Sequence, residues 1–379
     1  MDLALSPEKD AVRELAARFA DRELLPHAAE WDRREALDLG IVKQLGDLGF
    51  LGLTIPSAEG GSDGDHLAYC LVLEELGRGD SAVRGVLSVS LGLVAKTISG
   101  YGTPAQKSEW LPRLCAGEVL GCFALTEPGT GSDAGSLATR AVPDGTDWLI
   151  SGEKTFITNG TWADVALVFA RTDAGVTAFL VPTDAPGFSR HEIKGKLGLR
   201  AQATASLSFD AVRVPSTAVV GQLGKGFRIA MSALAKGRMS VAAGCVGIAQ
   251  GCLDAAVSYA GSRTQFGKPI AGHQLVQQLL SSIAVDTAAA RLLTWRVADL
   301  IDRGEPFATE SSMAKLFASE AAVRCANDAL QVFGGYGYID EYPVGKYLRD
   351  ARVMTLYEGT SQIQQLIIGR ALTGINAIS

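Results

Sequence analysis

A single carboxylate near the C-terminal end of the sequence is the strongest candidate for chemistry. Glu358 lies in the stretch Tyr357-Glu358-Gly359-Thr360, and an apolar-periodic segment follows it as far as Gly374. The glycine permits a bend, and the Thr360 hydroxyl can cap the helix that the segment predicts. An acidic residue at such a place is, however, also what the macrodipole of an ordinary helix favours. The local pattern leaves both a catalytic and a purely structural role open.

Composition and charge exclude several other functions. The chain has 379 residues, of which 47% are hydrophobic and 20% charged, as expected for a globular protein of two or three domains. Its net charge of −6 argues against nucleic acid or an anionic membrane as the main partner, since either favours a basic face. The first residues lack the basic and apolar regions of a signal peptide, and no later run approaches the roughly 18 apolar residues of a membrane span. We therefore expect a cytoplasmic protein without membrane insertion.

The histidines, cysteines and glycine motifs favour neither metal nor hydrolytic chemistry. The 4 histidines lie far apart, and the 6 scattered cysteines include no C-x-x-C pair, so we expect reduced, buried thiols and no metal site. The sequence has neither a G-x-S-x-G nucleophile elbow nor a G-x-x-x-x-G-K-[ST] phosphate loop. Hydrolases and nucleotide triphosphatases therefore lose support.

The first part of the chain predicts helices only. Ser6-Pro7 is typical of a capped helix start, and the apolar spacing continues to about Trp31. Ser81 is expected to cap a helix ending at Gly100, and Thr103-Pro104-Ala105-Gln106 fits a capping box. Residues 1–120 are therefore predicted to form an N-terminal helical domain.

The pattern then changes to strands and back to helices. Short runs of β-forming residues separated by turns predict a middle antiparallel β domain over residues 121–225. A C-terminal helical bundle over residues 226–379 follows from long helical patterns at about 226–260, 273–303, 309–333, 342–353 and 361–373. This order indicates an α+β multidomain fold and not a doubly wound sheet, so the incomplete glycine motif at Gly129-Thr130-Gly131-Ser132 is not expected to bind nicotinamide.

Five motifs in sequence order resemble the acyl-CoA dehydrogenase family, flavoproteins that desaturate acyl thioesters. The resemblance covers essentially the whole chain and agrees with the helix, strand, helix order. The motifs are Phe123-Ala124-Leu125-Thr126-Glu127-Pro128-Gly129-Thr130-Gly131-Ser132-Asp133, Phe156-Ile157-Thr158-Asn159, Arg263-Thr264-Gln265-Phe266-Gly267, Gln331-Val332-Phe333-Gly334-Gly335 and Tyr357-Glu358-Gly359-Thr360.

The reaction of that family sets chemical requirements that residues here could meet. Removing hydrogen from Cα and Cβ of a thioester needs a base for the α-proton, a hydride acceptor, and donors to the carbonyl oxygen. No side chain accepts hydride, so a cofactor is needed. The resemblance implies that FAD is this cofactor and that Glu358 is the base. Desolvation beside flavin and an acyl chain would raise the pKa of Glu358, while the helix N-terminus would oppose the rise.

The resemblance also assigns cofactor and substrate residues. Family tetramers bind the ADP half of FAD across a subunit interface, so a homotetramer is expected. The implied cofactor-binding residues are Phe123, Leu125, Thr126, Gly131, Ser132, Phe156 and Thr158 around the flavin, and Arg263, Gln265, Phe266, Gln274, Gln331, Gly334, Gly335, Thr360 and Gln362 around the ADP half and its cradle. The implied substrate-binding residues are Ser132, Arg238 and Gly359.

Three positions depart from the common family pattern. Phe156 stands where the family usually has tryptophan beside the flavin, which puts shielding and electron hand-off in doubt. Ala235 stands where many members carry an aspartate that contacts CoA. Gly237 stands where the isovaleryl-type branch carries its catalytic glutamate, and this leaves Glu358 as the base.

Arg84 and Ser88 are four residues apart in an almost wholly apolar helix and would share one face. Arg84 either reaches the surface or pairs with a nearby carboxylate of the chain, or it meets a carboxylate on the acyl group, as at the matching positions of glutaryl-CoA dehydrogenases. The segment from Gly237 to Gly247 instead looks like dehydrogenases of hydroxymalonyl units on acyl carrier protein.

The sequence therefore predicts an FAD-dependent dehydrogenase of a short acyl thioester, and Arg84 and Ser88 add the narrower expectation of a distal carboxylate on the acyl group. The alternatives are oxidation of a carrier-bound hydroxymalonyl-type unit and a catalytically silent flavin-binding scaffold. By resemblance, the electron acceptor is electron-transferring flavoprotein.

Overall fold

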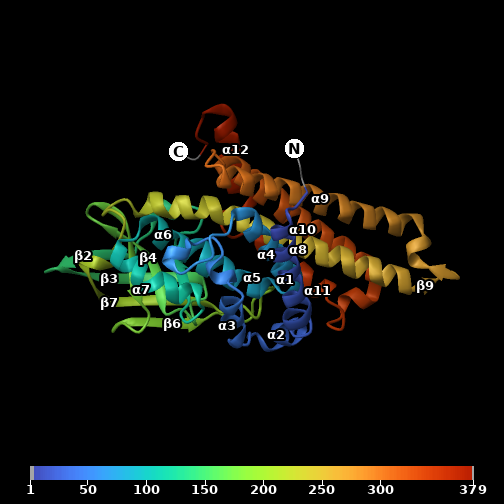
Figure 1. Cartoon of the computed structure of the whole chain (residues 1–379), viewed down its shortest axis with the longest axis horizontal. Coiled ribbons are helices and arrows are strands. Elements are labelled where there is room, and N and C mark those ends of the chain that lie inside the picture. Colours follow the sequence, from blue (N-terminus) through green and yellow to red (C-terminus); the bar gives the residue numbers. More distant parts are fainter. Residues whose placement is uncertain (1–3, 378–379) are drawn as a thin grey trace.

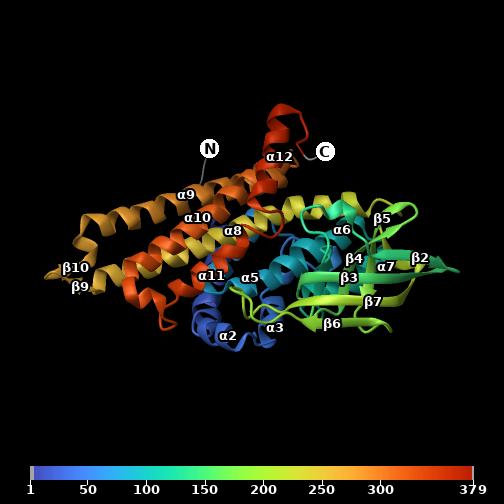
Figure 2. The same cartoon turned by 180° about the vertical axis from the view of Figure 1, so that it is seen from behind.

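Helical parts at both ends of the chain flank a sheet in the computed structural model, which describes residues 4–377. The sheet occupies one end of the molecule (Figure 1), and the small hairpin of β9 (Thr264–Gln265) and β10 (Lys268–Pro269) lies at the other end. The long helix α8 (Gly226–Ser262) runs between these ends, as the reverse view also shows (Figure 2). The α+β fold expected from the sequence is confirmed.

The N-terminal part contains short helices whose starts were mostly readable from the sequence. The Ser6 hydroxyl caps the first helix by accepting from the Lys9 amide, and Thr103 and Gln106 form the expected capping box. The elements are α1 (Pro7–Phe19), a π-helical turn Ala20–Leu24, α2 (Ala28–Arg34), α3 (Gly40–Asp47), α4 (His66–Gly79), α5 (Ser81–Leu87), a π-helical segment Ser88–Ala95, α6 (Lys96–Tyr101) and α7 (Pro104–Cys115).

Two details of this part differ from the sequence prediction. The first helix is interrupted by the π-helical turn and by a break before Ala28, so it does not run unbroken to Trp31. The cap of α5 is Asp80 and not Ser81, because the Asp80 carboxylate accepts from the Ala82 amide at 2.7 Å.

A single sheet of eight strands forms the middle part. Seven strands follow the order β6-β7-β3-β2-β4-β5-β8, and β1 pairs with β4. Neighbours are antiparallel except for the pairings of β4 with β1 and with β2, which are parallel. The strands are β1 (Gly121–Ala124), β2 (Arg140–Asp144), β3 (Asp147–Thr158), β4 (Val165–Thr172), β5 (Gly175–Pro182), β6 (Phe188–Glu192), β7 (Thr204–Pro215) and β8 (Val219–Val220).

The C-terminal helices lie within one to two residues of the predicted patterns. Besides α8 they are α9 (Gln274–Asp302), α10 (Ala308–Phe333), α11 (Val344–Met354) and α12 (Ser361–Thr373). Glycines let α8 cross α4 closely: a Cβ at Gly247 would lie 2.0 Å from the Glu74 carbonyl oxygen, and one at Gly77 would lie 2.6 Å from that of Gly244. This crossing holds α5, which follows α4, against the middle of α8.

A nearly buried ionic cluster ties α11 to α5 and to the loop before β7. Lys346 Nζ lies 2.6 Å from a carboxylate oxygen of Asp350 and 3.0 Å from one of Asp80. The Leu199 amide donates to Asp350 at 2.6 Å. Because the carboxylates raise the pKa of Lys346 well above its ordinary value despite burial, the ammonium stays charged. The cluster fixes three segments that carry residues of the site described below.

Two helical segments are apolar and long enough to cross a membrane, which corrects the expectation that no run approaches that composition. They are Ser81–Tyr101 and Gly226–Ser262, but 83% and 72% of their most apolar windows are buried inside the protein. Apolar composition in these helices is therefore accounted for by packing. The six cysteines are free and buried, as expected.

Candidate active site

The loop between α11 and α12 presents Glu358 through a sharp bend. Glu358 has φ 50° and Gly359 has φ 90°, two successive left-handed residues. This conformation is common for glycine but uncommon and costly for a glutamate, so the surroundings must hold it in place. The Thr360 hydroxyl then caps α12 by accepting from the Ile363 amide at 3.2 Å. The bend and the cap are those that the sequence indicated.

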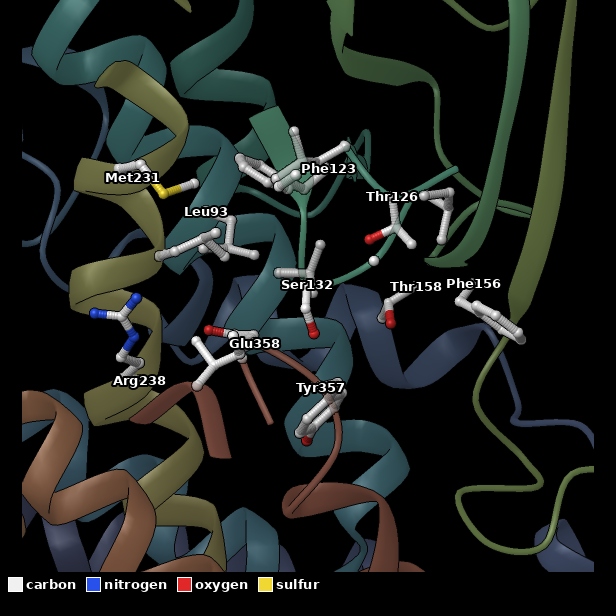
Figure 3. Close-up of a pocket in the computed structure, with 18 of the residues that line it drawn as sticks. Leu93, Phe123, Thr126, Ser132, Phe156, Thr158, Met231, Arg238, Tyr357 and Glu358 are labelled. Atoms are coloured by element: carbon white, nitrogen blue, oxygen red, sulfur yellow. The ribbon is translucent and has the colours of Figure 1, made fainter. Parts of the chain in front are cut away.

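The Glu358 carboxylate is shielded from water at the junction of two cavities. Figure 3 shows it between Arg238 on one side and Thr158 on the other. Its Oε2 atom is inaccessible and has no hydrogen-bond partner among the described residues. Burial raises the pKa of Glu358, and the nearby cations Arg84, Lys315 and Arg238 oppose the rise. A carboxyl with a raised pKa and a free oxygen is suited to accept a proton from a ligand.

Gly237 of α8 packs directly against this carboxylate. A Cβ built at Gly237 would lie 2.2 Å from Glu358 Oε2 and 3.1 Å from a methyl carbon of Leu93. Any side chain at this position would therefore compete with Glu358 for the same space. The structure thus explains why a side chain at Gly237 is incompatible with the present placement of the carboxylate.

We expect Gly237→Ala to lower the rate of the first reaction step about 100-fold, because a displacement of about 1 Å in a reacting group can have that effect. The rate of flavin bleaching by an acyl thioester measures it. Gly244→Ala is not a suitable control, since its Cβ would meet Arg84, but Gly369→Ala is, since no atom lies within 4 Å of that Cβ. A Gly237→Ala protein with the rate of Gly369→Ala would show that the close contact is not needed.

A cavity of about 580 Å³ extends from Glu358 between the π-helical segment, α8 and β1. Its walls are mostly apolar and come from Val89, Leu93, Phe123, Met231 and Leu234. Such walls suit a short hydrocarbon chain.

Part of the lining of this cavity is polar, because Arg84 and Ser88 belong to it. Arg84 is 1% exposed, and its Nη2 donates to the Tyr357 hydroxyl at 2.5 Å. Within residues 4–377, none of its side-chain hydrogen bonds goes to a carboxylate, and its Nε has no partner. The alternatives that Arg84 reaches the surface or pairs with an acidic residue of the chain are therefore wrong. Ser88 also lines the cavity, and its hydroxyl lies 2.8 Å from that of Ser240.

A second cavity of about 620 Å³ shares Glu358 and runs along the sheet. The hydroxyls of Thr126 and Thr158 border it (Figure 3), and no hydrogen bond of either is found within the described part of the chain. Phe156 also lines this cavity and is 69% exposed. Its backbone is left-handed, with φ 56°. A mostly apolar space bordered by hydroxyls without hydrogen-bond partners among the described residues fits an isoalloxazine ring, so these residues fit the expected flavin.

A buried ion pair holds the loop that carries Thr126. Lys154, which is 0% exposed, donates to the Leu125 carbonyl at 3.0 Å and to Glu127 at 2.8 Å. Burial would raise the pKa of Glu127, but hydrogen bonds from Lys154 and from Thr139 and Ala138 lower it to about 2. Glu127 therefore stays ionised, and its ion pair with Lys154 holds the loop that carries Thr126 in place.

The structure brings most, but not all, of the predicted site residues together. The residues that line one or both of these cavities are Arg84, Ser88, Phe123, Leu125, Thr126, Gly131, Ser132, Phe156, Thr158, Arg238, Glu358, Gly359 and Thr360. Gln362 is exposed on the first turn of α12.

A separate set of predicted residues lies at the other end of α8. Arg263, Gln265, Gly334 and Gly335 line a third, open cavity of about 460 Å³. Arg263 is 25 positions beyond Arg238, which corresponds to about 37 Å along a helix. Phe266, at 94% exposure, and the exposed Gln274 and Gln331 lie outside the cavity linings of the described residues. Within one chain, the residues around Glu358 and those around the third cavity are too far apart to contact the same part of one ligand.

Sequence reasoning missed residues that contact the Glu358 loop from other helices. Lys315 of α10 and Gln364 of α12 are both 0% exposed and donate to backbone carbonyls of the loop. The sequence contained a signal for Lys315, because the lysine falls on the same helical face as Ser311, four positions before it, and Ala318 and Ala322, three and seven positions after it. A lysine on a face of small residues requires a buried partner.

The fold and this site together define a class of protein. Along the chain, the strands of the sheet lie between two helical parts. The desolvated carboxylate of Glu358 lies where the apolar cavity meets the second cavity, which fits a flavin. This is the arrangement of a flavin-dependent acyl dehydrogenase. The chain belongs to the acyl-CoA dehydrogenase family, whose enzymes are oxidoreductases. Models of its N-terminal, middle and C-terminal domains match residues 6–118, 122–212 and 224–373.

Individual relatives support the same family. The chain is 43% identical over 362 residues to the short-chain specific acyl-CoA dehydrogenase of Bos taurus mitochondria, covering 94% of this chain and 88% of the relative. A glutaryl-CoA dehydrogenase from Mycobacterium smegmatis in complex with FADH2 matches with TM-score 0.96 and 36% identity, covering 99% of this chain and 97% of that one. The prolyl acyl carrier protein oxidase AnaB matches with TM-score 0.94 and 30% identity, over 98% of this chain and 100% of that one.

Proposed function

We propose that this protein catalyses FAD-dependent α,β-dehydrogenation of a short acyl thioester that carries a distal carboxylate. The observation that supports the carboxylate is Arg84, a fully buried guanidinium in the lining of the apolar cavity, with no hydrogen-bonded carboxylate partner among the described residues. A buried charge with no directly paired carboxylate is costly, and an anionic substrate group hydrogen-bonded to it would offset that cost.

The other charges around the cavity agree with an anionic substrate. Arg238 is 8% exposed and its Nε has no partner within residues 4–377, while Lys315 is 0% exposed. Among the described residues that line this cavity, Glu358 is the one buried carboxylate whose charge acts on both guanidinium groups. It favours a higher pKa for Arg84 and for Arg238. A substrate carboxylate at Arg84 would therefore add a counter-ion to a region in which buried cations outnumber buried anions.

Glu358 is proposed as the base that removes the α-proton, because its carboxylate borders the apolar cavity and packs against Gly237. FAD, when bound, supplies the hydride acceptor that no side chain can provide. Phe123, Leu125, Thr126, Gly131, Ser132, Phe156 and Thr158 would hold its flavin half. Ser132, Arg238 and Gly359 would contact the substrate.

The separation of the third cavity from Glu358 supports a shared cofactor site in a homotetramer. Arg263, Gln265, Gly334 and Gly335 would bind the ADP half of FAD held mainly by another subunit, together with Phe266, Gln274 and Gln331. Thr360 and Gln362 would complete the cradle. An arginine suits a pyrophosphate because its fork donates charge-assisted hydrogen bonds. Electron-transferring flavoprotein as acceptor and a cytoplasmic location stay predictions.

A second candidate is oxidation of a carboxylated unit on an acyl carrier protein. The observations that favour it are Ala235, which lacks the carboxylate that many members direct at CoA, and the match to a carrier-protein oxidase. The same Arg84 would hold a malonyl-type carboxylate. Only the carrier, and the bond that is oxidised, would differ.

A panel of thioesters tests these proposals. The purified holoenzyme is mixed anaerobically with glutaryl-CoA, butyryl-CoA and a carboxylated acyl carrier protein, and the rate of flavin bleaching is recorded. We expect glutaryl-CoA to bleach the flavin at least tenfold faster than butyryl-CoA at equal low concentration, since a charge-assisted hydrogen bond is worth about one factor of ten or more. Faster bleaching by butyryl-CoA would overturn the carboxylate proposal, and bleaching by the carrier protein alone would favour the second candidate. No bleaching by any of them would favour the scaffold alternative.

A further inference from the structure

The backbone of the Glu358 loop is held by two buried side chains from different helices. Lys315 Nζ of α10 donates to the Gly359 carbonyl at 2.7 Å. Gln364 Nε2 of α12 donates to the same carbonyl at 2.9 Å and to the Glu358 carbonyl at 3.2 Å. Both side chains are 0% exposed. These bonds hold the two left-handed residues through their carbonyl oxygens, and neither donor lines the two cavities that share Glu358.

One of these two donors carries a charge that hydrogen bonding alone does not require. Gln364 shows that a neutral amide can bind both carbonyls. Burying an ammonium is costly, and burial lowers the pKa of Lys315 to about 8. In the described part of the chain, the side-chain hydrogen bond of Lys315 goes to a neutral carbonyl and none goes to a carboxylate. A charged residue at this cost indicates that the charge itself has a use.

Two carboxylates lie near this charge, and Glu358 interacts with it more strongly than Glu320 does. The Cys245 thiol also faces Lys315, but burial keeps it protonated by raising its pKa to about 12. The charged or titratable groups that face Glu358 are Arg84 of α5, Arg238 of α8, Lys315 of α10, its neighbour Tyr357, and Tyr69 of α4. Burial keeps both tyrosines protonated by raising their pKa values, so the three cations are the groups that favour an ionised Glu358. Arg84 and Arg238 border the acyl cavity, whereas Lys315 does not.

We propose that Lys315 is a positioning residue that holds the Glu358 loop through the Gly359 carbonyl and whose positive charge favours the ionised form of the Glu358 carboxylate, the form that can accept a proton. Gln364 shares the first task but not the second. The catalytic part of this inference rests on the proposed role of Glu358 as base. The charge of Lys315 acts below a pH of about 8 and is lost above it, as the ammonium loses its proton.

Two variants separate the hydrogen bond from the charge. Lys315→Met removes both, and Gln364→Leu, the matched control, removes hydrogen bonds to the same loop without changing any charge. The rate of flavin bleaching by butyryl-CoA, which has no distal carboxylate, is followed from about pH 5.5 to 9.5. We expect Lys315→Met to lower the rate about tenfold at every pH through the lost hydrogen bond. Through the lost charge it should also move the midpoint of the rising limb upward by about one pH unit, which adds a further tenfold loss at low pH that narrows above a pH of about 8. Gln364→Leu should lower the rate about tenfold at every pH and leave the midpoint in place.

A second measurement keeps this test independent of activity. The infrared band of the Glu358 carboxyl, identified by its loss in Glu358→Gln, is titrated in the resting holoenzyme. An upward shift of its midpoint in Lys315→Met supports the charge effect even if Glu358 proves not to be the base. A failure of the charge effect can therefore be distinguished from a failure of the proposed role of Glu358. An unchanged midpoint overturns the inference.

A third variant decides the matter if Lys315→Met does not fold, as judged by thermal unfolding and flavin content. Lys315→Arg keeps a permanent charge, so its Glu358 midpoint should stay at or below that of the unmodified protein. A higher midpoint in Lys315→Arg would overturn the proposal.

Discussion

Replacing Glu358 by glutamine is expected to lower the rate of flavin bleaching by acyl thioesters about 10²–10⁴-fold, the usual contribution of a positioned general base. Glutamine has nearly the same size and cannot take up the α-proton. Its amide fits where the Oε2 atom of Glu358 now lies without a partner, so the fold should be retained. The measurement is anaerobic stopped-flow bleaching with glutaryl-CoA and butyryl-CoA, together with the flavin content of the purified protein.

The control for this prediction is Glu358→Asp, which keeps a carboxylate on a shorter side chain. It should recover part of the activity, because Gly237 leaves room for the shorter group to move while Arg238 still faces it. A Glu358→Gln protein that bleaches at the unmodified rate would remove Glu358 from the catalytic role. Loss of flavin in both variants would instead mean that the loop serves cofactor binding.

Replacing Arg84 by alanine is expected to lower the preference for glutaryl-CoA over butyryl-CoA about 10–100-fold, measured as the ratio of kcat/KM values. A hydrogen bond to a charged group contributes about 1.5–3 kcal/mol, and each 1.4 kcal/mol is a factor of ten. The ratio is the informative quantity, because Arg84 also donates to Tyr357, the neighbour of Glu358. Losing that bond would slow both substrates together.

Tyr357→Phe is the matched control for Arg84. It removes the 2.5 Å hydrogen bond but leaves the guanidinium charge in the cavity lining. The preference for the carboxylated substrate should survive in Tyr357→Phe and disappear in Arg84→Ala. If both variants change the ratio equally, Arg84 acts only through Tyr357. If neither changes it, the substrate carboxylate is not held by Arg84.

Local patterns were enough to place most elements because they depend on neighbouring residues. The end of α10 at Phe333, the end of α12 just before Gly374 and the capping box at Thr103 fall where the sequence predicted. Helical periodicity likewise gave α12 without error, since its start and end are both marked by a capping residue. The error at α5, where Asp80 replaces Ser81 as the cap, concerns two adjacent residues that can both cap a helix.

The sequence by itself determined the order of helices and strands, the five family motifs and the identity of Glu358 as the carboxylate to examine. Only the tertiary structure decided what surrounds that carboxylate. Gly237 meets Glu358 across 121 positions of sequence, and Lys315 reaches its loop across a separation of 44. It also decided that Arg84 is buried without a carboxylate partner. The physical reason is that desolvation and charge at one atom sum over every element packed around it, and periodicity along one helix shows which face is buried but not what the face meets.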